Sequence, residues 1–357
     1  MTDRPDPLLA HPNPTETARP GGRPTPAGDP LSDVLRTVRL RGSVFFMLES
    51  SSPWSNGMPD GQTLAPILVP QAQQVVSFHV ITQGACWGGL LDGPQIRLEA
   101  GDVLVFPRGD GYFMSFARQE PTPPDVDLAS GFMKGMTAGQ LPFVVQFGGG
   151  GAERLSVVCG FLGCDVRPFN PLLATLPRML HIKGVAGRQD DRLDRLLELT
   201  LAEARQPAPG GESVRLRLSE LMFVEVIRRY LGGLPPEQAG WLAGLRDEYV
   251  GRALALLHER AAHGWTLDEL AGDVGMSRSA FADRFARLVG EPPMQYLTRW
   301  RMQMAARLLA DGSAKVAAVA LEVGYDSEAA FSRAFKKLAG VSPAAWRGQR
   351  LEARKPG

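Results

Sequence analysis

Two segments near the C-terminal end of the chain repeat one another. The first reads LAGDVGMSRSAFADRFARLVGEPPMQYL and the second reads VALEVGYDSEAAFSRAFKKLAGVSPAAW. With one extra residue in the second copy, the following identical pairs align: Gly275 with Gly324, Ser277 with Ser327, Phe281 with Phe331, Phe285 with Phe335, Gly290 with Gly340 and Pro293 with Pro343. Agreement at this many matched spacings indicates one structural unit that is used twice.

Each copy predicts two helices joined by a tight turn. Gly275 is expected to end the first helix, because glycine adopts the positive φ that helix C-termini favour. Ser277 is placed to cap the second helix by accepting a backbone hydrogen bond. Phe281 and Phe285 lie four residues apart, so they share one face, which we expect to be buried against the first helix. This pattern is typical of a helix-turn-helix, whose second helix presents its other face outwards.

A single helix is predicted between the two units. Leu297, Trp300, Met304 and Leu308 recur at spacings of three and four residues along QYLTRWRMQMAARLL, which is the period of one buried helix face. Such a helix would hold the two units at a constant separation, and successive major grooves on one face of DNA lie about 34 to 36 Å apart. The two helix-turn-helix units are therefore predicted to bind double-stranded DNA together, as one rigid body.

The segment from about residue 250 to 347 resembles the DNA-binding domain of the AraC/XylS family of bacterial regulators. RMQMAARLL followed by VAAVALEVGYDSEAAFSRAFKKLAGVSP carries most of the resemblance. It implies that the second helix of each unit, about residues 277–288 and 327–338, enters the major groove of promoter DNA, where side chains reach base edges. By their positions on these helices, the predicted DNA-binding residues are Arg278, Ser279, Ala282, Asp283, Arg284, Glu328, Ala329, Ser332, Arg333, Lys336 and Lys337.

Two features of this set differ from a uniform basic surface. Lys336 and Lys337 are better suited to phosphates than to bases, because lysine is a compact point charge. Many members of the family carry arginine where this chain has Asp283, with Arg284 next to it. Aspartate accepts a hydrogen bond from cytosine N4 but is repelled by phosphate. The bases that the first unit reads therefore stay open.

The first half of the chain predicts a β-rich domain. Between about residues 31 and 166, short apolar segments such as QVVSFHVI and PFVVQF alternate with glycines and prolines, which is typical of β-strands. In PQIRLEAGDVLVFP, the alternation followed by a turn at Ala100, Gly101 and Asp102 predicts a hairpin that leads into Val103–Phe106. From about residue 171 to 230 the apolar spacing changes to three and four, which predicts helices.

This half resembles the cupin-like β-barrel that serves as sensing domain in one branch of the same family. The segments DPLSDVLRTVRLRGSVFF, GACW, LEAGDVLVFPRGD and NPLLATLP carry the resemblance. The expected fold class is multidomain α+β, with an N-terminal cupin-like β-barrel with flanking helices and a C-terminal all-α domain of two helix-turn-helix units. The expected parts are a disordered tail over residues 1–29, an effector-sensing barrel over 30–170, a helical dimerisation or linker region over 171–245 and a DNA-binding domain over 247–348.

Cupin barrels also occur in enzymes. The presence or absence of metal ligands therefore distinguishes a metal-dependent cupin enzyme from a sensing domain. A metal-dependent cupin needs several histidines and a carboxylate that converge inside the barrel. Here Tyr112 stands where a ligand histidine would fall, and the other motif offers only His79. We therefore predict no enzyme activity, no bound metal and no cofactor. A cupin enzyme with an accessory DNA-binding domain and an effector-independent architectural DNA-binding protein stay open as alternatives.

A small-molecule effector is predicted to bind in the barrel. The candidates for lining its pocket are Trp54, His79, Trp87 and Tyr112. Aromatic residues on barrel strands more often belong to the core, so simple packing is the competing interpretation. The cysteines are interpreted as buried inert thiols, with a thiol switch or a soft metal site as the alternative; they are Cys86, Cys159 and Cys164.

The bulk composition indicates a regulator that stays in the cytoplasm. Lysine and arginine number 39 against 38 aspartates and glutamates, so any charge that attracts DNA must be local. No apolar run approaches the roughly 20 residues of a membrane span, and the N-terminus lacks a signal-peptide pattern. The expected partners are promoter DNA, a small-molecule effector, a second copy of the chain, and RNA polymerase if the protein is an activator. The family resemblance implies that the barrel and the helices after it form the dimer contact, and simple packing of these helices against the barrel is the alternative.

Overall fold

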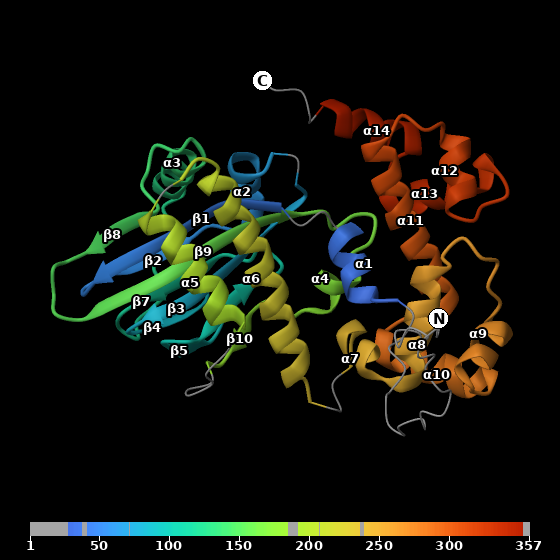
Figure 1. Ribbon diagram of the computed structural model, residues 1–357, viewed down its shortest axis with the longest axis horizontal. Helices are drawn as coiled ribbons and strands as arrows, with labels where there is room; N and C mark the ends of the chain where they lie inside the picture. The colour runs from blue at the N-terminus through green and yellow to red at the C-terminus, as the bar shows by residue number, and fades with distance from the viewer. Residues whose placement is uncertain are drawn as a thin grey trace, which may run out of the picture.

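The computed structural model describes residues 28–37, 41–70, 72–184, 192–206, 208–235 and 239–352. The predicted disordered tail over residues 1–29 lies almost wholly outside these ranges. Figure 1 shows a β-rich half and a helical half, with the short helices α1 (Pro30–Thr37) and α4 (Pro171–Thr175) lying between them. Among the described residues, no helix combines the length and the apolar character needed to cross a membrane.

The N-terminal half contains two β-sheets. The six-stranded sheet has the order β10-β6-β3-β9-β1-β8 and the four-stranded sheet has the order β2-β7-β4-β5. Strand β1 pairs with β8 in parallel, and the other recorded pairs are antiparallel. The strands are β1 (Arg41–Ser51), β2 (Ser55–Met58), β3 (Gln74–Gln83), β4 (Ala85–Leu90), β5 (Gln95–Glu99), β6 (Val103–Phe106), β7 (Tyr112–Ser115), β8 (Val144–Gly148), β9 (Arg154–Cys164) and β10 (Leu180–Ile182).

Alternation along the strands produces two hydrophobic cores. On β3, Ile81 faces the barrel interior, where α2 (Gly61–Leu68) and α3 (Val126–Thr137) contribute Leu64 and Met133. Phe78 faces the opposite side of the same sheet, which α5 (Arg192–Arg205) and α6 (Gly211–Gly233) cover, and it packs near Phe223. Both faces of the six-stranded sheet are therefore buried around β3.

The hairpin predicted around Gly101 is wrong. Strand β5 pairs with β4 in the four-stranded sheet, whereas β6 pairs with β3 and β10 in the six-stranded sheet. The turn between β5 and β6 bonds to β3, because the Gly101 N–H donates to the Ile81 carbonyl at 2.8 Å and the Ile81 N–H donates to the Asp102 carbonyl at 3.0 Å. These long-range bonds carry the chain from one sheet to the other, which a local turn pattern cannot reveal.

The helical half contains the two predicted helix-turn-helix units. The first is formed by α9 (Leu267–Val274) and α10 (Arg278–Val289), and the second by α12 (Val316–Glu322) and α13 (Glu328–Ala339). The predicted connecting helix is α11 (Pro293–Asp311), and the units are flanked by α7 (Trp241–Arg246), α8 (Glu248–Glu259) and α14 (Pro343–Glu352). This confirms the expected all-α C-terminal architecture.

The turns follow the predicted chemistry at three of four positions. Gly275 and Gly324 adopt left-handed φ values of 80° and 81°. The hydroxyl of Ser327 accepts from the Ala330 N–H at 3.2 Å. Ser277 occupies the equivalent N-cap position of α10, but its side chain makes no cap bond, so the predicted cap is wrong there.

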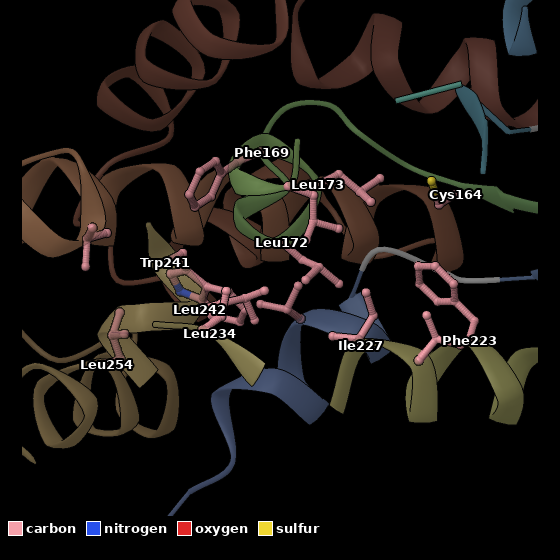
Figure 2. Packing of buried hydrophobic residues seen from close by; sticks show 14 of the residues in the cluster. Cys164, Phe169, Leu172, Leu173, Phe223, Ile227, Leu234, Trp241, Leu242 and Leu254 are labelled. Carbon is pink, nitrogen blue, oxygen red and sulfur yellow. The ribbon is translucent and has the colours of Figure 1, made fainter. Parts of the chain in front are cut away.

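One hydrophobic core joins the barrel to the first helix-turn-helix unit. It runs from Phe78 under α6, through Leu172 and Trp241, to Phe281 and Phe285 of α10, and Figure 2 shows its middle part, where Phe169, Leu172, Trp241 and Leu242 meet. The second unit has a separate core that contains Phe331, Phe335 and Trp346. The barrel is therefore joined to the first unit through α1, α4 and α7, whose buried residues belong to this core.

Candidate nucleic-acid interface

The second unit presents a basic outer face on helix α13. Phe331 and Phe335 are fully buried, as predicted for the inner face. Glu328, Ala329 and Arg333 are exposed and Ser332 is half-buried on the outer side, while Lys336 and Lys337 are exposed towards the end of the helix. All six predicted DNA-binding residues of this unit thus lie on one accessible helix.

The first unit presents a mixed surface on helix α10. Phe281 and Phe285 are fully buried, and Arg278, Ser279 and Asp283 are exposed. Arg278 forms an exposed ion pair with Asp268 of α9 at 3.0 Å, and Ala282 is half-buried. An exposed pair of this kind contributes little stability, so Arg278 can exchange Asp268 for a DNA acceptor at small cost.

Arg284 has a different environment from the other predicted DNA-binding residues. Its Nε lies 3.1 and 3.0 Å from the two carboxylate oxygens of Asp247, its Nη2 lies 2.6 Å from Oδ2, and its guanidinium packs over the Tyr249 ring. Asp247 also caps α8 by accepting from the Val250 N–H. Burial raises the pKa of Asp247, but the hydrogen bonds from Arg284 and Val250 outweigh it and lower the pKa overall. Arg284 thus ties α10 to the start of α8.

One exposed cation on α10 was missed by the sequence prediction. Arg287 is exposed in the last turn of α10. The repeat that aligns Phe285 with Phe335 also aligns Arg287 with Lys337, which was among the predicted phosphate ligands. The internal alignment therefore contained the signal that identifies Arg287.

The four predicted effector-pocket residues do not converge on one point. His79 and Tyr112 meet in the barrel interior with ring centroids 4.9 Å apart. Trp87 lies on the opposite face of β4 from the buried Cys86, and its ring packs under the guanidinium groups of Arg97 and Arg118. Trp54 packs edge-on to Phe116 at the margin of the interior core. Successive side chains of a strand point to opposite faces, and this alternation turns Trp87 out of the barrel. The sequence alone did not show which residues of β4 face the interior.

The His79 and Tyr112 pair contains an unsatisfied polar atom. His79 Nδ1 lies 3.3 Å from Cys159 Sγ. The other ring nitrogen, Nε2, is buried without a hydrogen-bond partner among the described residues. The buried Tyr112 hydroxyl makes no hydrogen bond of full geometry there, but the Ser77 side chain lies close enough to act on its pKa. Burial lowers the pKa of His79 to about 3, so the imidazole is neutral at neutral pH. A buried polar atom without a partner costs free energy.

The cysteines are buried free thiols. Cys86 and Cys159 face the barrel interior and Cys164 faces the core on the other side of the sheet. Burial raises the pKa of the Cys86 thiol to about 12 and also raises those of Cys159 and Cys164. A protonated thiol is a poor nucleophile. Within the described ranges, no group of three histidine, cysteine, aspartate or glutamate residues is placed to hold a metal ion.

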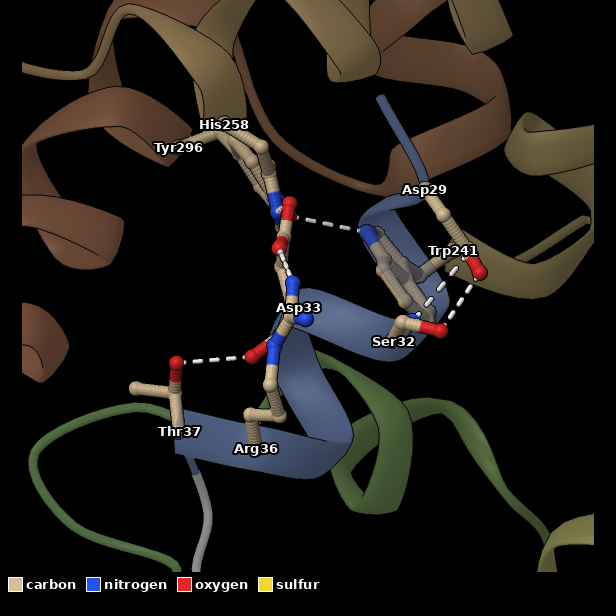
Figure 3. Close-up of polar contacts among 8 residues, drawn as sticks. All are labelled: Asp29, Ser32, Asp33, Arg36, Thr37, Trp241, His258 and Tyr296. Carbon is tan, nitrogen blue, oxygen red and sulfur yellow. Dashed lines mark hydrogen bonds and ion pairs between the residues drawn. The ribbon is translucent and has the colours of Figure 1, made fainter. Parts of the chain in front are cut away.

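A polar chain connects α1 of the N-terminal half to α7, α8 and α11, the helices next to the first helix-turn-helix unit (Figure 3). The Trp241 Nε1–H donates to the Tyr296 hydroxyl oxygen at 2.8 Å, and the Tyr296 hydroxyl lies 2.7 Å from His258 Nε2. His258 Nδ1 in turn faces Asp33 Oδ2 of α1 at 3.6 Å. Burial lowers the pKa of His258, so the imidazole is neutral and can accept from Tyr296 while its Nδ1–H points to Asp33.

A second contact joins the segment after the barrel to α11. The buried Phe169 N–H donates to Gln303 Oε1 at 3.0 Å. The Phe169 ring lies under the Arg299 guanidinium at 4.0 Å and packs edge-on to Tyr296 at 5.5 Å. Both halves of the molecule thus contact the helix that carries the two helix-turn-helix units.

Comparison with known proteins shows the same two parts. Residues 29–232 match the Cupin family and residues 270–349 match the Helix-turn-helix domain family. A putative AraC-like transcription regulator of Streptomyces antibioticus is 31% identical over 89% of this chain and 98% of its own length. The HTH-type transcriptional regulator AlkR of Acinetobacter baylyi is 27% identical over 90% of this chain and 99% of its own length.

Among solved structures, the DNA-binding domain of the global transcriptional factor AdpA, in complex with a target DNA, is 32% identical to this chain. It covers 31% of this chain and 99% of its own, with a TM-score of 0.30. The relatives that match nearly the whole chain, together with the two matched domains, show that the chain belongs to the AraC family of DNA-binding transcription regulators and carries an N-terminal cupin domain.

Proposed function

We propose that this regulator binds two successive major grooves through α10 and α13, and that a small molecule in the barrel changes this binding. The observation that carries the first part is that two matched recognition helices, each with a buried phenylalanine pair, are attached to the single helix α11. Two rigidly attached helices can enter grooves on one face of the duplex.

The exposed residues of the two helices support a division of roles. Base contacts are assigned to Arg278, Ser279, Ala282, Asp283, Glu328, Ala329, Ser332 and Arg333. Phosphate contacts are assigned to Arg287, Lys336 and Lys337, which are exposed cations near the helix ends. Arg284 is assigned to positioning α10, because a DNA contact would require it to leave Asp247.

The test is binding of the full chain to the intergenic DNA beside its own gene, by footprinting and by fluorescence anisotropy at several salt concentrations. We expect protection of two consecutive major grooves. Arg333→Ala should weaken operator binding about 5- to 150-fold, which corresponds to the roughly 1–3 kcal/mol of a base-specific contact. The matched control is Lys134→Ala, which removes an exposed cation of α3 on the barrel and should leave binding unchanged. Weak, sequence-blind binding that falls steeply with salt would favour the architectural alternative.

The barrel interior around His79 and Tyr112 is the proposed effector site. Its support is the unpartnered His79 Nε2 beside the Tyr112 hydroxyl inside a mainly apolar core, since a ligand that bonds to His79 Nε2 would remove the desolvation cost of that atom. A thermal-shift screen of the full chain tests this site. A compound that stabilises the wild type, loses that effect in Tyr112→Phe and changes operator affinity would support effector control.

The proposed route from the barrel to DNA runs through Phe169 and Asp33, which contact α11 and α8. A ligand acts along it only if it binds two arrangements of these contacts with different affinities. We also propose a homodimer that forms through the outer faces of α5 and α6, where Leu199, Val214 and Leu221 are exposed. Transcription from a promoter with the footprinted site, with purified RNA polymerase, would distinguish an activator from a repressor.

A further inference from the structure

Among the residues that the structure describes, the two helix-turn-helix units share no hydrophobic core apart from the helix that joins them. The first part of α11 contributes Tyr296, Leu297 and Trp300 to the core of the first unit, and the later part contributes Met302 and Leu309 to the core of the second. A helix of 19 residues is about 28 Å long. It sets the distance between the units, but their relative rotation about its axis depends on contacts made beside it.

Arg301 makes such contacts at the junction of the two cores. Its Nε–H donates to the Ala261 carbonyl at 2.7 Å and its Nη2 donates to the His263 carbonyl at 2.6 Å, both in the loop that leads into α9 of the first unit. Its Nη1 donates to the Gly324 carbonyl at 3.4 Å, in the turn of the second unit. The planar guanidinium can bond to carbonyls on both sides at once, which the single ammonium of lysine cannot reproduce in the same geometry.

Gly324 packs against the same loop. A Cβ on Gly324 would lie 2.4 Å from the Ala262 carbonyl oxygen, which is far inside van der Waals contact. Gly275 holds the equivalent position in the first unit with nearly the same φ, 80° against 81°. A Cβ on Gly275 would meet nothing within 4 Å. The turn of the second unit is therefore pressed against the first unit, whereas the turn of the first unit is open.

We propose that Arg301, together with the Gly324 contact, locks the second unit against the first and thereby sets which spacing between the two half-sites the protein accepts. Arg301 is a positioning residue in this account, because its three partners are backbone carbonyls of the two units. One inserted base pair rotates a half-site by roughly a tenth of a helical turn and shifts it along the axis. If the two units are held in one orientation, an altered spacing weakens binding to the operator. If the units can rotate about α11, they can still bind both half-sites.

The inference rests on the proposed binding to two successive grooves, so the wild type is measured first. Anisotropy titrations use the footprinted operator, derivatives with one base pair inserted or deleted between the half-sites, and each half-site alone. We expect the wild type to lose about tenfold in affinity, about 1.4 kcal/mol, on either altered spacing. If the wild type binds the altered spacings as tightly as the natural operator, the lock is overturned. If one half-site alone binds as tightly as the whole operator, the two-groove binding is overturned as well.

The variant Arg301→Met is then compared with Arg307→Met. Arg307 lies on the same helix and pairs with Asp311 across one turn, so its replacement should leave the spacing preference intact. For Arg301→Met we expect weaker binding to the natural operator, a preference among spacings reduced to about twofold or less, and unchanged affinity for each half-site. Arg301→Lys should resemble Arg301→Met. A wild-type spacing preference in Arg301→Met overturns the lock alone, and so does an equal loss on the isolated half-sites.

The glycine pair gives an independent comparison that controls for backbone strain. An alanine at either position has to adopt a positive φ, which is strained for a residue with a Cβ, so Gly275→Ala and Gly324→Ala should lose similar thermal stability from this cause. Only Gly324→Ala drives a side chain into the Ala262 carbonyl, so only this variant should shift or broaden the spacing preference. An altered preference in both variants, or in neither, contradicts the proposal.

Discussion

At the residue scale, the same kind of side chain performs different tasks on the recognition helices. Arg333 is an exposed cation on the outer face of α13. Arg284 is held by a bidentate bond to Asp247, which itself caps α8. Sequence position predicted that both residues contact DNA. The bond from Arg284 to a carboxylate 37 positions away supports the proposal that Arg284 positions α10.

Arg284→Ala is expected to destabilise the protein, and Arg333→Ala is not. Asp247 would lose the partner of a half-buried carboxylate, and after a discount for solvent screening the cost should be about 1 kcal/mol. Urea unfolding of the two variants and the wild type measures this difference. Wild-type stability of Arg284→Ala combined with weaker operator binding would instead make Arg284 a DNA contact.

His79 should make the stability of the barrel sensitive to acid. The unfolded chain binds a proton at His79 below about pH 6.5, whereas burial lowers the pKa of the folded histidine to about 3. Above about pH 6.5 both states carry a neutral imidazole. As the pH falls below that value, proton uptake at His79 stabilises the unfolded state, so the free energy of unfolding decreases towards pH 3 by roughly 1.4 kcal/mol per pH unit. In His79→Phe that slope should be absent. Urea unfolding of both proteins at pH 7, 6 and 5 tests this. Parallel pH profiles of the wild type and the variant would contradict it. The contribution of His258 to the pH dependence is the same in both proteins, so it cancels in the comparison.

At the element scale, helices α5 and α6 have one face buried and another that exposes apolar residues. Met222 and Phe223 of α6 are buried against the sheet. Val214 and Leu221 lie seven residues apart on the same helix with exposed fractions of 45% and 52%, and Leu199 of α5 is 58% exposed. A seven-residue spacing places both α6 residues on one stripe, which is the kind of surface that a second copy covers.

Leu221→Glu should therefore shift the protein from dimer to monomer. Light scattering after size-exclusion chromatography at several concentrations measures the mass. Leu128→Glu on α3 is the matched control, since Leu128 is also an exposed leucine, at 69%, but lies on another helix. The proposed dimer face is wrong if Leu221→Glu keeps the wild-type mass.

At the scale of the whole molecule, the barrel and the first DNA-binding unit share one core, and the second unit has its own. Phe169 lies at the centre of the shared region, with its ring between Arg299 and Tyr296 and its N–H bonded to Gln303. A continuous core makes the parts on both sides unfold together.

Phe169→Ala should uncouple the barrel from the first unit. Removal of a buried aromatic ring costs roughly 3–5 kcal/mol, and this loss falls on the contact between the halves. Calorimetry should show the wild-type barrel and first unit unfolding in one transition, and the variant in two. Phe46→Ala, which removes a ring from the barrel interior, should lower stability without splitting the transition. An unsplit transition in Phe169→Ala would mean that the halves are joined elsewhere.

The sequence by itself determined the helix-turn-helix pair, the connecting helix and the β-rich first half. These follow from local rules: the positive φ of Gly275 and Gly324, the four-residue spacing of Phe281 and Phe285, and the change from strand to helix periodicity after the barrel. Each rule acts within a few residues, so it can be read without knowing what lies across the core.

Only the tertiary structure decided which residues meet from distant parts of the chain. In the structure, β5 and β6 lie in different sheets, Trp87 points out of the barrel, and Arg284 forms an ion pair with Asp247. It also brought Arg301 to the carbonyls of both units and Phe169 to Gln303. Hydrogen bonds between segments tens of residues apart depend on register and on the packing of whole elements, and neither leaves a periodic signal in the sequence.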